Sequence, residues 1–571
     1  MGLVNRCNLV YINTQKTRYR QMRKKLLAVL MMIIFGLFDT PSSEAQLPAD
    51  LPWAQPNQHL ILQRGGIAAV TCGTTTEILP ANRFTFGMFN IDGVVPDNFR
   101  MDRSFDPSAP GNPDNAQAYH HPSWTVEQIG NVFGVAINER TRAVFLTASS
   151  NYGSHFFSSN TPSSNVPAVL RYGDIGGGAE DLEAAGAIYR VDAVTGRVDQ
   201  QPFAVLPQQE TTVTHIACET GGPVVRSTGV GLGNIHYDKF HNQYFVTNIE
   251  DGRIYRLGPD GDILDSYDPG EDDNGLPGIG QFTDLVNGIA VEPNGDRLFF
   301  GGVSTTNSVP LKSIQLTFDG GFPGTIDNSG LPAGVPNNFH DAIETDHGSV
   351  ETETAAVANI LNLVGPNATF HHISDLEFLP GPNPKLLVGI RVGCGSNWAS
   401  SYNHTGESLE ISPVGGIYDP DSISTEFDVT QDDDFAAEDA YGGVSYHVLG
   451  DGSIDYVVTS SDILSDAGPH GIAVFHAVSS AVSPIIPLAA VSYGEVDNGD
   501  PKGVGGSVDV SNVFNCLVGD ANLDDSINFS DIPAFISVLQ RGRYLCEADI
   551  DQNGRVDFSD IPLFILVLLN Q

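Results

Sequence analysis

Two twelve-residue segments near the C-terminus carry oxygen-bearing side chains at identical spacing. They run from Asp520 to Asp531 and from Asp549 to Asp560, and they align without gaps at an offset of 29 residues. Positions 1, 3, 5, 9 and 12 hold Asp520, Asn522, Asp524, Asn528 and Asp531 in the first segment and Asp549, Asp551, Asn553, Asp557 and Asp560 in the second. At position 7, Ser526 and Arg555 would each offer a backbone carbonyl oxygen. Oxygen ligands at this spacing are suited to a hard divalent cation.

The spacing has a physical reason, because calcium takes six to eight oxygen ligands at about 2.3–2.6 Å. A tight loop points alternate residues inward and brings their oxygens within that range of one ion. Position 6 needs a sharp turn, which Gly554 supplies readily and Asp525 supplies only in a left-handed conformation. The sequence therefore predicts two Ca²⁺ sites formed by the twelve residues above. The alternative is a pair of solvated acidic turns that bind nothing.

Each loop is followed by apolar residues at helical spacing, which would hold its last ligand in place. These residues are Ile532, Phe535, Ile536 and Leu539 after the first loop, and Ile561, Phe564, Ile565 and Leu568 after the second. Position 12 would begin the helix, where a carboxylate suits the positive end of the helix dipole. Pro533 and Pro562 fall in the first helical turn, where proline is tolerated. We expect one helix behind each loop.

This pattern resembles the dockerin type I repeat, a half EF-hand in which a calcium loop is followed by a single helix. The resemblance covers about residues 516–571 and implies a small all-α domain that folds on calcium and binds a cohesin-like protein partner. Dockerins of cellulose-degrading complexes often carry Ser/Thr pairs at loop positions 10 and 11, whereas this chain has Phe529-Ser530 and Phe558-Ser559. That departure weakens the case for a cellulosome-type cohesin. The two phenylalanines would instead pack against the adjoining domain or form a different docking face.

Cysteine usage predicts one disulfide bridge in this segment. Cys516 and Cys546 flank matching positions of the two loops, and a domain of some 56 residues has little core. A bridge between them, together with calcium, would supply the missing stability. The alternative is two unrelated thiols, and the sequence gives no prediction for Cys72, Cys218 and Cys394.

The first 45 residues are typical of a secretory signal peptide. A basic stretch at 18–25 precedes an apolar run at 26–38, and small residues precede Gln46. We expect removal of residues 1–45 and a secreted, periplasmic or cell-surface location, with an uncleaved anchor as the alternative. The net charge of -41 excludes nucleic acid as a partner of the general surface. No other stretch is apolar enough to span a membrane, so no membrane partner is expected after signal removal.

Residues 46–515 show little helical periodicity and instead repeat pairs of short strands. Each pair consists of an apolar strand, a turn often built on Pro-Asn-Gly or Gly-Asp-Gly, and a second apolar strand. Five hairpins begin at Gly134, Asn234, Gly288, Asp375 and Gly443, and looser outer strands begin at Gly66, Ala187, Arg253, Ser313, Gly416 and Gly471. Five or six irregular units of about four strands predict a mainly β fold, a β-propeller. The alternatives are a β-sandwich, several small β-domains or a β-helix.

The segments GRIYRLGPDGDILDSY and GIAVEPNGDRLFF resemble the NHL and gluconolactonase-like six-bladed β-propellers. In the gluconolactonase-like family, Asn and acidic residues at strand starts hold a divalent cation that activates water. Residues at or near such starts here are Asn131, Asn234, Asn287, Asp375, Asp439 and His470, although only the segment from Asn287 matches that family's motif closely. The alternative is that they are ordinary turn residues. No Gly-x-Ser-x-Gly elbow, His-Glu-x-x-His helix or phosphate-binding glycine loop occurs in the sequence.

Two functional hypotheses follow from these patterns. The first is an exported calcium-binding protein, a propeller platform with a carbohydrate as candidate ligand, attached to a cohesin-like or other protein through its C-terminal domain. The second is an exported metal-dependent hydrolase or lyase acting on a polysaccharide, another carbohydrate or a lactone, with the propeller as catalytic domain. We favour binding because no complete catalytic constellation is visible in the sequence. Convergent acidic groups and His around the channel mouth would favour the enzyme.

Overall fold

The computed structural model describes segments of the chain between residues 66 and 570, and the expected signal peptide lies outside them. The longer stretches outside the description are 75–84, 91–117, 149–185, 270–285, 352–369, 394–405, 428–440, 462–470, 477–488 and 493–502, with shorter ones between elements. The described part is mainly β, as predicted, and its helices lie after residue 530. We call the strand-bearing part (66–512) the β body and the part that follows it (517–570) the helical module.

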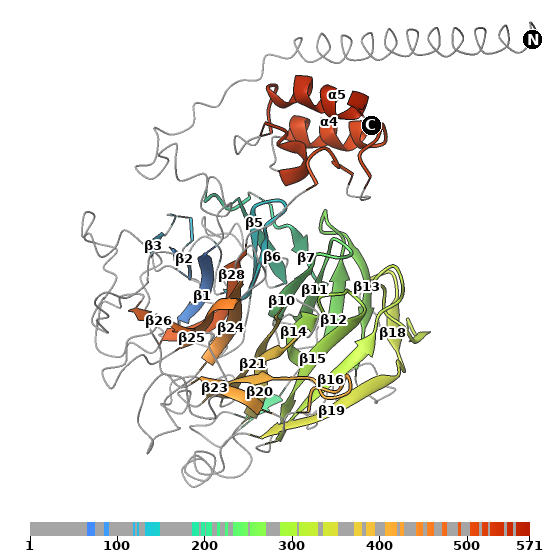
Figure 1. Cartoon of the computed structure of the whole chain (residues 1–571). Coiled ribbons are helices and arrows are strands. Elements are labelled where there is room, and N and C mark those ends of the chain that lie inside the picture. Colours follow the sequence, from blue (N-terminus) through green and yellow to red (C-terminus); the bar gives the residue numbers. More distant parts are fainter. Residues whose placement is uncertain are drawn as a thin grey trace, which may run out of the picture. The chain divides into compact units, whose positions relative to one another are not determined.

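Three sheets of the β body have four antiparallel strands each (Figure 1). The first is ordered β28 (Gly503–Ser511), β1 (Ile67–Thr74), β2 (Phe86–Asn90) and β3 (Ala118–Tyr119). The second is ordered β4 (Val132–Asn138), β5 (Ala143–Ala148), β6 (Ala187–Asp192) and β7 (Ala204–Val205). The third is ordered β24 (Tyr441–Val448), β25 (Ile454–Ser461), β26 (Gly471–His476) and β27 (Ala489–Ser492).

Two larger sheets contain the same four-stranded unit. The six-stranded sheet is ordered β10 (Leu232–Asp238), β11 (Gln243–Asn248), β12 (Arg253–Leu257), β13 (Ile263–Tyr267), β18 (Asn338–His340) and β17 (Thr325–Ile326). The eight-stranded sheet joins β14 (Val286–Val291), β15 (Arg297–Ser304), β16 (Ser308–Gln315) and β19 (Glu344–Glu351) to β20 (Phe370–Phe378), β21 (Leu386–Gly393), β22 (Gly406–Ile411) and β23 (Ile423–Phe427). The junction is a short pairing of β15 with β20. A separate pair consists of β8 (Thr214–Ile216) and β9 (Pro223–Val225).

All five predicted hairpins are confirmed. They are β4–β5, β10–β11, β14–β15, β20–β21 and β24–β25, each antiparallel. The outer segment predicted from Gly416 is only half right, because Val414 and Ile417 form an isolated bridge at a turn and the strand begins at Ile423. The strand that pairs with β21 at this place is β22, whose sequence GESLEI carries little apolar alternation.

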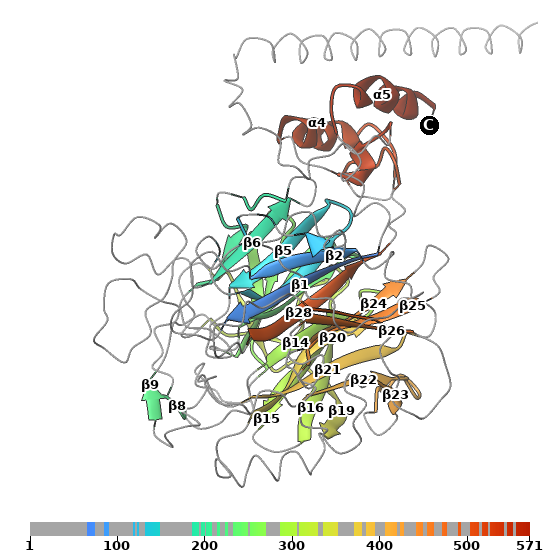
Figure 2. The ribbon, with the colours of Figure 1, turned by 90° about the vertical axis from the view of Figure 1, so that its left-hand side faces the viewer.

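One strand of each four-stranded unit lies innermost, and the innermost strands form a closed series. Strands β28, β4, β10, β14, β20 and β24 contact one another in that order, and β24 contacts β28 again. Figure 2 shows β28 between β1 and the sheet of β24 to β26. The series closes because β28, from the end of the β body, pairs with β1 from its beginning, as Ile67 opposite Ser511 shows. A closed series of radially arranged sheets is the arrangement of a β-propeller.

Hydroxyl groups on the second strands join neighbouring units. Thr147 Oγ1 on β5 donates to the carbonyl oxygen of Gly233 on β10 at 2.7 Å. The inner strands are irregular in register at these points, as β10 is between Leu232 and Ile235. A bulged carbonyl lacks a regular ladder partner, so the hydroxyl satisfies it. Equivalent bonds run from Thr247 to Asn287, from Thr71 to Phe133 and from Ser460 to Gly506.

Apolar side chains fill the space between neighbouring sheets. On β11, Tyr244 packs with Phe145 of the preceding unit, whereas Phe245 packs with Phe300 of the following unit. Successive residues of a strand point to opposite faces, so a strand with a sheet on each side is apolar on both. This explains why every residue of β11 is buried.

The helical module contains the two predicted helices, α4 (Asp531–Arg541) and α5 (Asp560–Asn570), and a short 3₁₀ helix, η7 (Cys546–Ala548). Both α-helices begin at loop position 12, as predicted. The rings of Phe535 and Phe564 stack between them with centroids 4.1 Å apart. Leu545, Ala548 and Leu568 complete a small buried core with Ala521.

Candidate functional site

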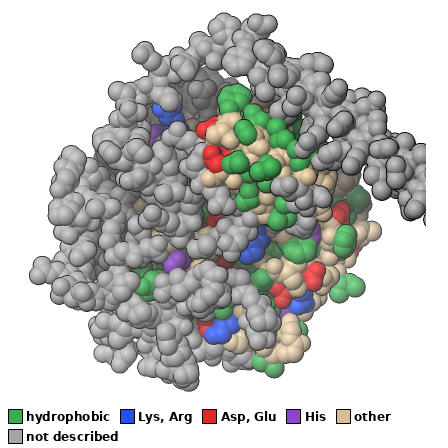
Figure 3. All heavy atoms as spheres, turned by 45° about the horizontal axis from the view of Figure 1, so that its top comes forward, with side chains coloured by type: hydrophobic (Ala, Val, Ile, Leu, Met, Phe, Trp, Pro, Cys, Tyr) green, Lys and Arg blue, Asp and Glu red, His purple; other side chains and the backbone are tan. Residues whose placement is uncertain are grey.

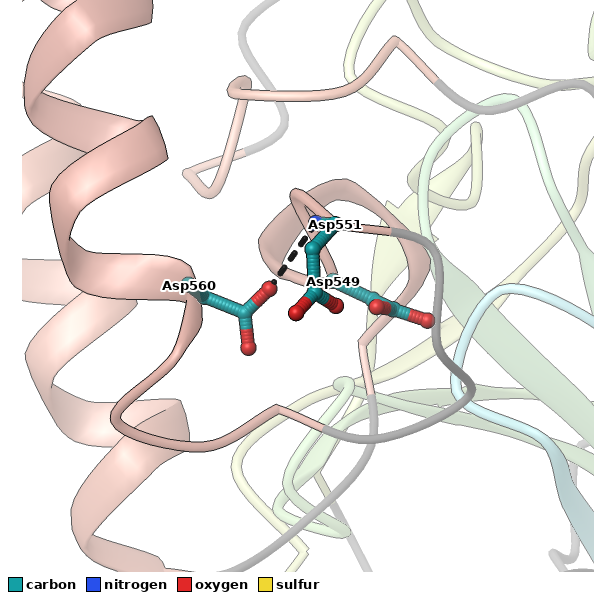
Figure 4. Close-up of side chains that lie close together, drawn as sticks. All are labelled: Asp549, Asp551 and Asp560. Carbon is teal, nitrogen blue, oxygen red and sulfur yellow. Dashed lines mark hydrogen bonds between the residues drawn. The ribbon is translucent and has the colours of Figure 1, made fainter.

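The position-12 carboxylate organises the second acidic loop. Asp560 is buried at the start of α5, and its Oδ1 accepts the backbone N–H groups of Ile550 (2.7 Å) and Asp551 (3.1 Å). Its Oδ2 accepts the N–H of Asp557 at 2.8 Å. The carboxylate therefore folds the loop back onto the beginning of the helix, and Figure 4 shows Asp549, Asp551 and Asp560 side by side there.

The first loop repeats this arrangement. Asp531 is buried at the start of α4, its Oδ1 accepts the N–H of Asn522 at 3.1 Å and its Oδ2 accepts the N–H of Asn528 at 2.7 Å. These are again the residues at positions 3 and 9. A bond between positions 9 and 11 also occurs in both loops. Asn528 Oδ1 accepts the backbone N–H of Ser530 at 2.8 Å, and Asp557 Oδ1 accepts the backbone N–H of Ser559 at 2.7 Å. The two loops thus share these bonds, and the second loop adds the bond from the Ile550 N–H to Asp560.

The second loop has the geometry that a calcium ion requires. Asp549, Asp551 and Asp560 each offer a carboxylate oxygen, and these oxygens lie within 4.8 Å of one another. Two oxygens that are both about 2.4 Å from an ion are at most about 4.8 Å apart, so the spacing of the three oxygens is compatible with one shared calcium ion. Burial raises the pKa of Asp560, and the charge of Asp551 raises it further. A bound cation would reverse that effect.

The predicted ligands divide into those the structure describes and those it does not. The described ones all lie in the two loops: Asp520, Asn522, Ser526, Asn528, Asp531, Asp549, Asp551, Asp557 and Asp560. Asp524, Asn553 and Arg555 lie outside the described residues, and so does Cys516. Position 3 of the first loop is the amide of Asn522, so that loop presents one carboxylate fewer at this position than the second.

Apolar side chains are exposed on α5 but not at the matching positions of α4. Leu563 and Leu566 are 38% and 53% exposed, and Phe558 at loop position 10 is 63% exposed. The residues 29 positions earlier than the two leucines are Ala534 and Ser537. In Figure 3, hydrophobic side chains gather beside acidic ones on the surface turned toward the viewer. The second helix of the module therefore carries the larger apolar surface.

The β body contains a second cluster of titratable side chains around a cavity of about 90 Å³. Inner strands β10, β20 and β28 and the turn after β4 bring the cluster together. Its charged and titratable lining consists of Glu139, His236, Asp238, Lys239, Glu292, Asp375, Glu377 and Asp509. Pockets for drug-sized ligands measure about 300–1,000 Å³, so this cavity is large enough only for a few water molecules or a small ion.

Burial disfavours the charged form of several of these groups. It raises the pKa of Glu377 and of Asp509 well above the usual carboxyl range, and neighbouring carboxyl groups raise both further. Burial lowers the pKa of His236 to about 4. His236 is therefore neutral at pH 7, and its 3.9 Å contact with Glu377 Oε2 through Nδ1 is not an ion pair.

Asp375, one of the strand-start residues singled out above, connects three inner strands. Its carboxylate accepts the N–H of Val444 (3.1 Å), the hydroxyl of Ser507 (2.9 Å) and the side-chain amide of Asn234. Burial raises its pKa to about 7 despite these donors. Asn287 is buried, and its carbonyl oxygen accepts the Thr247 hydroxyl. Asn131, Asp439 and His470 lie outside the described residues.

Glu139, Glu377 and Asp509 were not singled out from the sequence. Their signal is an acidic side chain within or beside an otherwise apolar inner strand, as in FHHISDLEF of β20. That signal is weak, because strand ends often carry acidic residues. Only the closed series of strands brings these three together.

A buried serine–histidine contact in the β body does not form a nucleophile. Ser313 Oγ lies 2.8 Å from His347 Nε2, but the backbone N–H of Tyr418 donates to His347 Nδ1 at 3.2 Å. Nδ1 is therefore the acceptor and Nε2 carries the proton, so His347 cannot take a proton from Ser313. Both side chains are buried, which fits a structural role.

Comparisons with known proteins give only distant likenesses. No family model matches the chain, and no curated protein matches it. Among solved structures, the Dos1 propeller is 12% identical with a TM-score of 0.28, and the match covers 60% of this chain and 57% of that one. The β-propeller domain of Cps50 (Swd1) from Myceliophteria thermophila is 10% identical with a TM-score of 0.30, over 72% and 89% of the two chains. A putative 6-phosphogluconolactonase from Bacteroides uniformis is 12% identical with a TM-score of 0.33, over 74% and 82%.

At these identities and TM-scores the likenesses carry no argument about function. The propeller arrangement rests instead on the closed series of inner strands. Within the described residues, no helix combines the length and the apolarity that a membrane crossing requires.

Proposed function

We propose that this chain is an exported calcium-binding protein, in which a six-bladed β-propeller is a binding platform and a dockerin-like C-terminal domain attaches it to a protein partner. The count of six blades is supported by the six innermost strands that contact one another in a closed series. Export is supported by the basic and apolar pattern of residues 1–45. The platform role is supported by the small central cavity, which leaves the outer surfaces as the binding area.

The observation that carries the calcium part is the duplicated loop geometry. In both loops the buried position-12 carboxylate accepts N–H groups from positions 3 and 9. Two solvated acidic turns that bind nothing would not be expected to share these hydrogen bonds. In the second loop, the oxygens of Asp549, Asp551 and Asp560 also lie close enough to share an ion.

A disulfide would complete the domain. Cys546 is disulfide-bonded, and we propose Cys516 as its partner because each cysteine shortly precedes the first position of a loop. The bridge would close a loop of about 30 residues, which is worth about 3–4 kcal/mol in the chain-entropy model. Mass spectrometry of peptides digested without reductant would identify the partner.

The exposed face of α5 supports docking to a protein. A helix that is apolar on nearly every side is expected to be covered, and Leu563 and Leu566 are not. Replacing both leucines with Ser should abolish binding to a cohesin-type domain in calcium while leaving calcium affinity unchanged. The matched control is Ala534→Ser on α4, which should keep full binding. Equal binding by all three proteins, measured by biolayer interferometry, would rule out α5 as the docking face.

Calcium titration tests the proposal directly. The full mature chain should bind two Ca²⁺ in isothermal titration calorimetry, and Asp531→Ala and Asp560→Ala should each remove one. Asp319→Asn, an exposed acidic residue of the β body, should leave both sites intact and controls for the change in charge. Chelation should raise hydrogen exchange in residues 517–570 and leave strands β14 to β23 of the β body unchanged. Absence of calcium binding would refute the proposal.

The cavity supports a second candidate, a hydrolase or lyase acting on a carbohydrate or lactone. Pairs of carboxyl groups with shifted pKa values are typical of acid–base catalysis, and Glu377 and Asp509 form such a pair. Glu377→Gln should then abolish hydrolysis of lactone and glycoside substrates. Glu410→Gln is the matched control, since Glu410 is a buried carboxylate that pairs with Lys385 and Tyr446 away from the cavity. No turnover by the unmodified protein would exclude this candidate.

A further inference from the structure

The turn between β4 and β5 contacts the helical module at η7. The carbonyl oxygen of Arg140 in this turn accepts the backbone N–H of Cys546 at 2.9 Å. The Arg140 Nε lies 3.1 Å from Glu547 Oε1. The Glu547 side chain is only 2% exposed and that of Arg140 is 19% exposed, so this ion pair is largely shielded from water. A shielded pair is far more sensitive to the loss of one partner than a surface pair is.

The contact lies between the first positions of the two calcium loops. The carbonyl oxygen of Glu547 accepts the N–H of Gly519 at 2.7 Å, and Gly519 precedes Asp520. Two residues after Glu547 comes Asp549, whose N–H is bonded to the carbonyl oxygens of Leu545 and Cys546. The short helix η7 is therefore bonded to the beginning of both loops. An ion that orders the loops would also fix η7.

The chain segment that leads to the module is short and starts at the same turn. Only five residues lie between Ser511, the last residue of β28, and Leu517, so the segment spans at most about 20 Å. Its first residue, Asn512, donates its N–H to Glu139 Oε1 at 3.3 Å, beside Arg140. Short connections give effective concentrations in the millimolar range, which favours docking within one chain. A second copy is disfavoured because each chain carries a net charge of -41.

We propose that the helical module docks onto the β4–β5 turn of its own chain through Arg140 and Glu547, and that calcium in the two loops stabilises this docking. The inference rests on the proposed calcium sites. It adds an internal partner for the module and a link between calcium and the relative position of the two parts. Such a link is reciprocal: the factor by which calcium strengthens docking equals the factor by which docking strengthens calcium binding.

The test uses the full mature chain, with and without EGTA, and three variants. Arg140→Ala removes the ion pair, Glu547→Gln removes its charge at constant volume, and Arg256→Ala removes a comparable ion pair in another sheet of the β body as the control. Hydrogen exchange of peptides covering 132–148 reports docking, and calorimetry reports calcium affinity. We expect chelation to speed exchange at the turn about tenfold. Arg140→Ala and Glu547→Gln should do the same in calcium and should weaken calcium binding about tenfold, whereas Arg256→Ala should change neither readout.

Each other result overturns a distinct part. Two normal calcium sites with no effect of Arg140→Ala at the turn would overturn the docking and leave the calcium sites standing. If Arg140→Ala removes the hydrogen-exchange protection of the turn but EGTA leaves that protection in place, the link to calcium is overturned. Absence of calcium binding in every protein would overturn the proposed function itself. Protection that depends on protein concentration, with dimer mass in light scattering, would replace the internal partner by a second copy.

Discussion

Replacing Asp560 with Ala should unfold the second loop and α5 even in calcium-saturated buffer. The carboxylate accepts three N–H groups, from Ile550, Asp551 and Asp557, and it is fully buried. A hydrogen bond to a charged group is worth about 1.5–3 kcal/mol net, so three bonds that share two oxygens are worth about 4–5 kcal/mol. A domain of this length has a total stability of about 3–8 kcal/mol. The substitution therefore removes about as much free energy as the whole module has.

Hydrogen exchange resolved by mass spectrometry measures this loss within the intact chain. Exchange in peptides of 545–570 should approach that of an unfolded chain in Asp560→Ala, while peptides of the β body serve as the internal reference. Asp531→Ala loses two such bonds and should cost less, about 3 kcal/mol. Asp560→Asn keeps one acceptor oxygen and should fall between the unmodified protein and Asp560→Ala. Unchanged exchange in Asp560→Ala would refute the role assigned to this carboxylate.

Three further predictions concern the β body. Because burial raises the pKa of Asp375 to about 7, above about 3.9 in the unfolded chain, its contribution to stability is present below about pH 4 and is lost as the pH rises to 7. Asp375→Asn should remove this pH dependence of the free energy of unfolding, which is up to about 1.4 kcal/mol per pH unit. Denaturant unfolding at pH 5, 6 and 7 measures it, and an equal pH dependence in both proteins would contradict the prediction. Gly134→Ala should cost about 1–3 kcal/mol of stability because the added carbon would lie 2.6 Å from the Gly233 carbonyl oxygen. Gly258→Ala, with its nearest neighbour at 3.6 Å, should cost less. Equal urea midpoints for the two variants would count against the close approach. Thr147→Val should lose about 1–3 kcal/mol by leaving the same carbonyl oxygen unsatisfied, and an unchanged melting temperature would show that the hydroxyl bond is dispensable.

Local patterns in the sequence predicted the hairpins and the C-terminal helices. In GIAVEPNGDRLFF the turn residues and both strands are neighbours in the chain, so all the determinants of β14–β15 lie within one segment. The helices α4 and α5 begin at the predicted carboxylates, because the residue at loop position 12 is also the first residue of the helix. In the second acidic loop, the spacing in the sequence singled out Asp549, Asp551 and Asp560, which the structure brings together.

Long-range pairing could not be predicted in this way. The strand β28 is rich in glycine and was not predicted, because its partner β1 lies more than 400 residues away and no local pattern records the pairing. The cluster of carboxyl groups around the cavity could not be predicted for the same reason, since Glu139 and Asp509 meet only when the series of strands closes. The contact of Arg140 with Glu547 depends on the same closure, because it joins the first half of the chain to its end.

The pairing of β28 with β1 can form only late in the synthesis of the chain. About 430 residues separate the two strands, so at roughly 5–20 residues per second the ribosome needs about 20–90 s between them. During that interval one edge of β1 has no strand to pair with, and open strand edges invite aggregation. In a nascent chain of this protein that edge therefore stays open until translation is nearly finished, and a prematurely terminated chain never gains the strand that completes its first sheet.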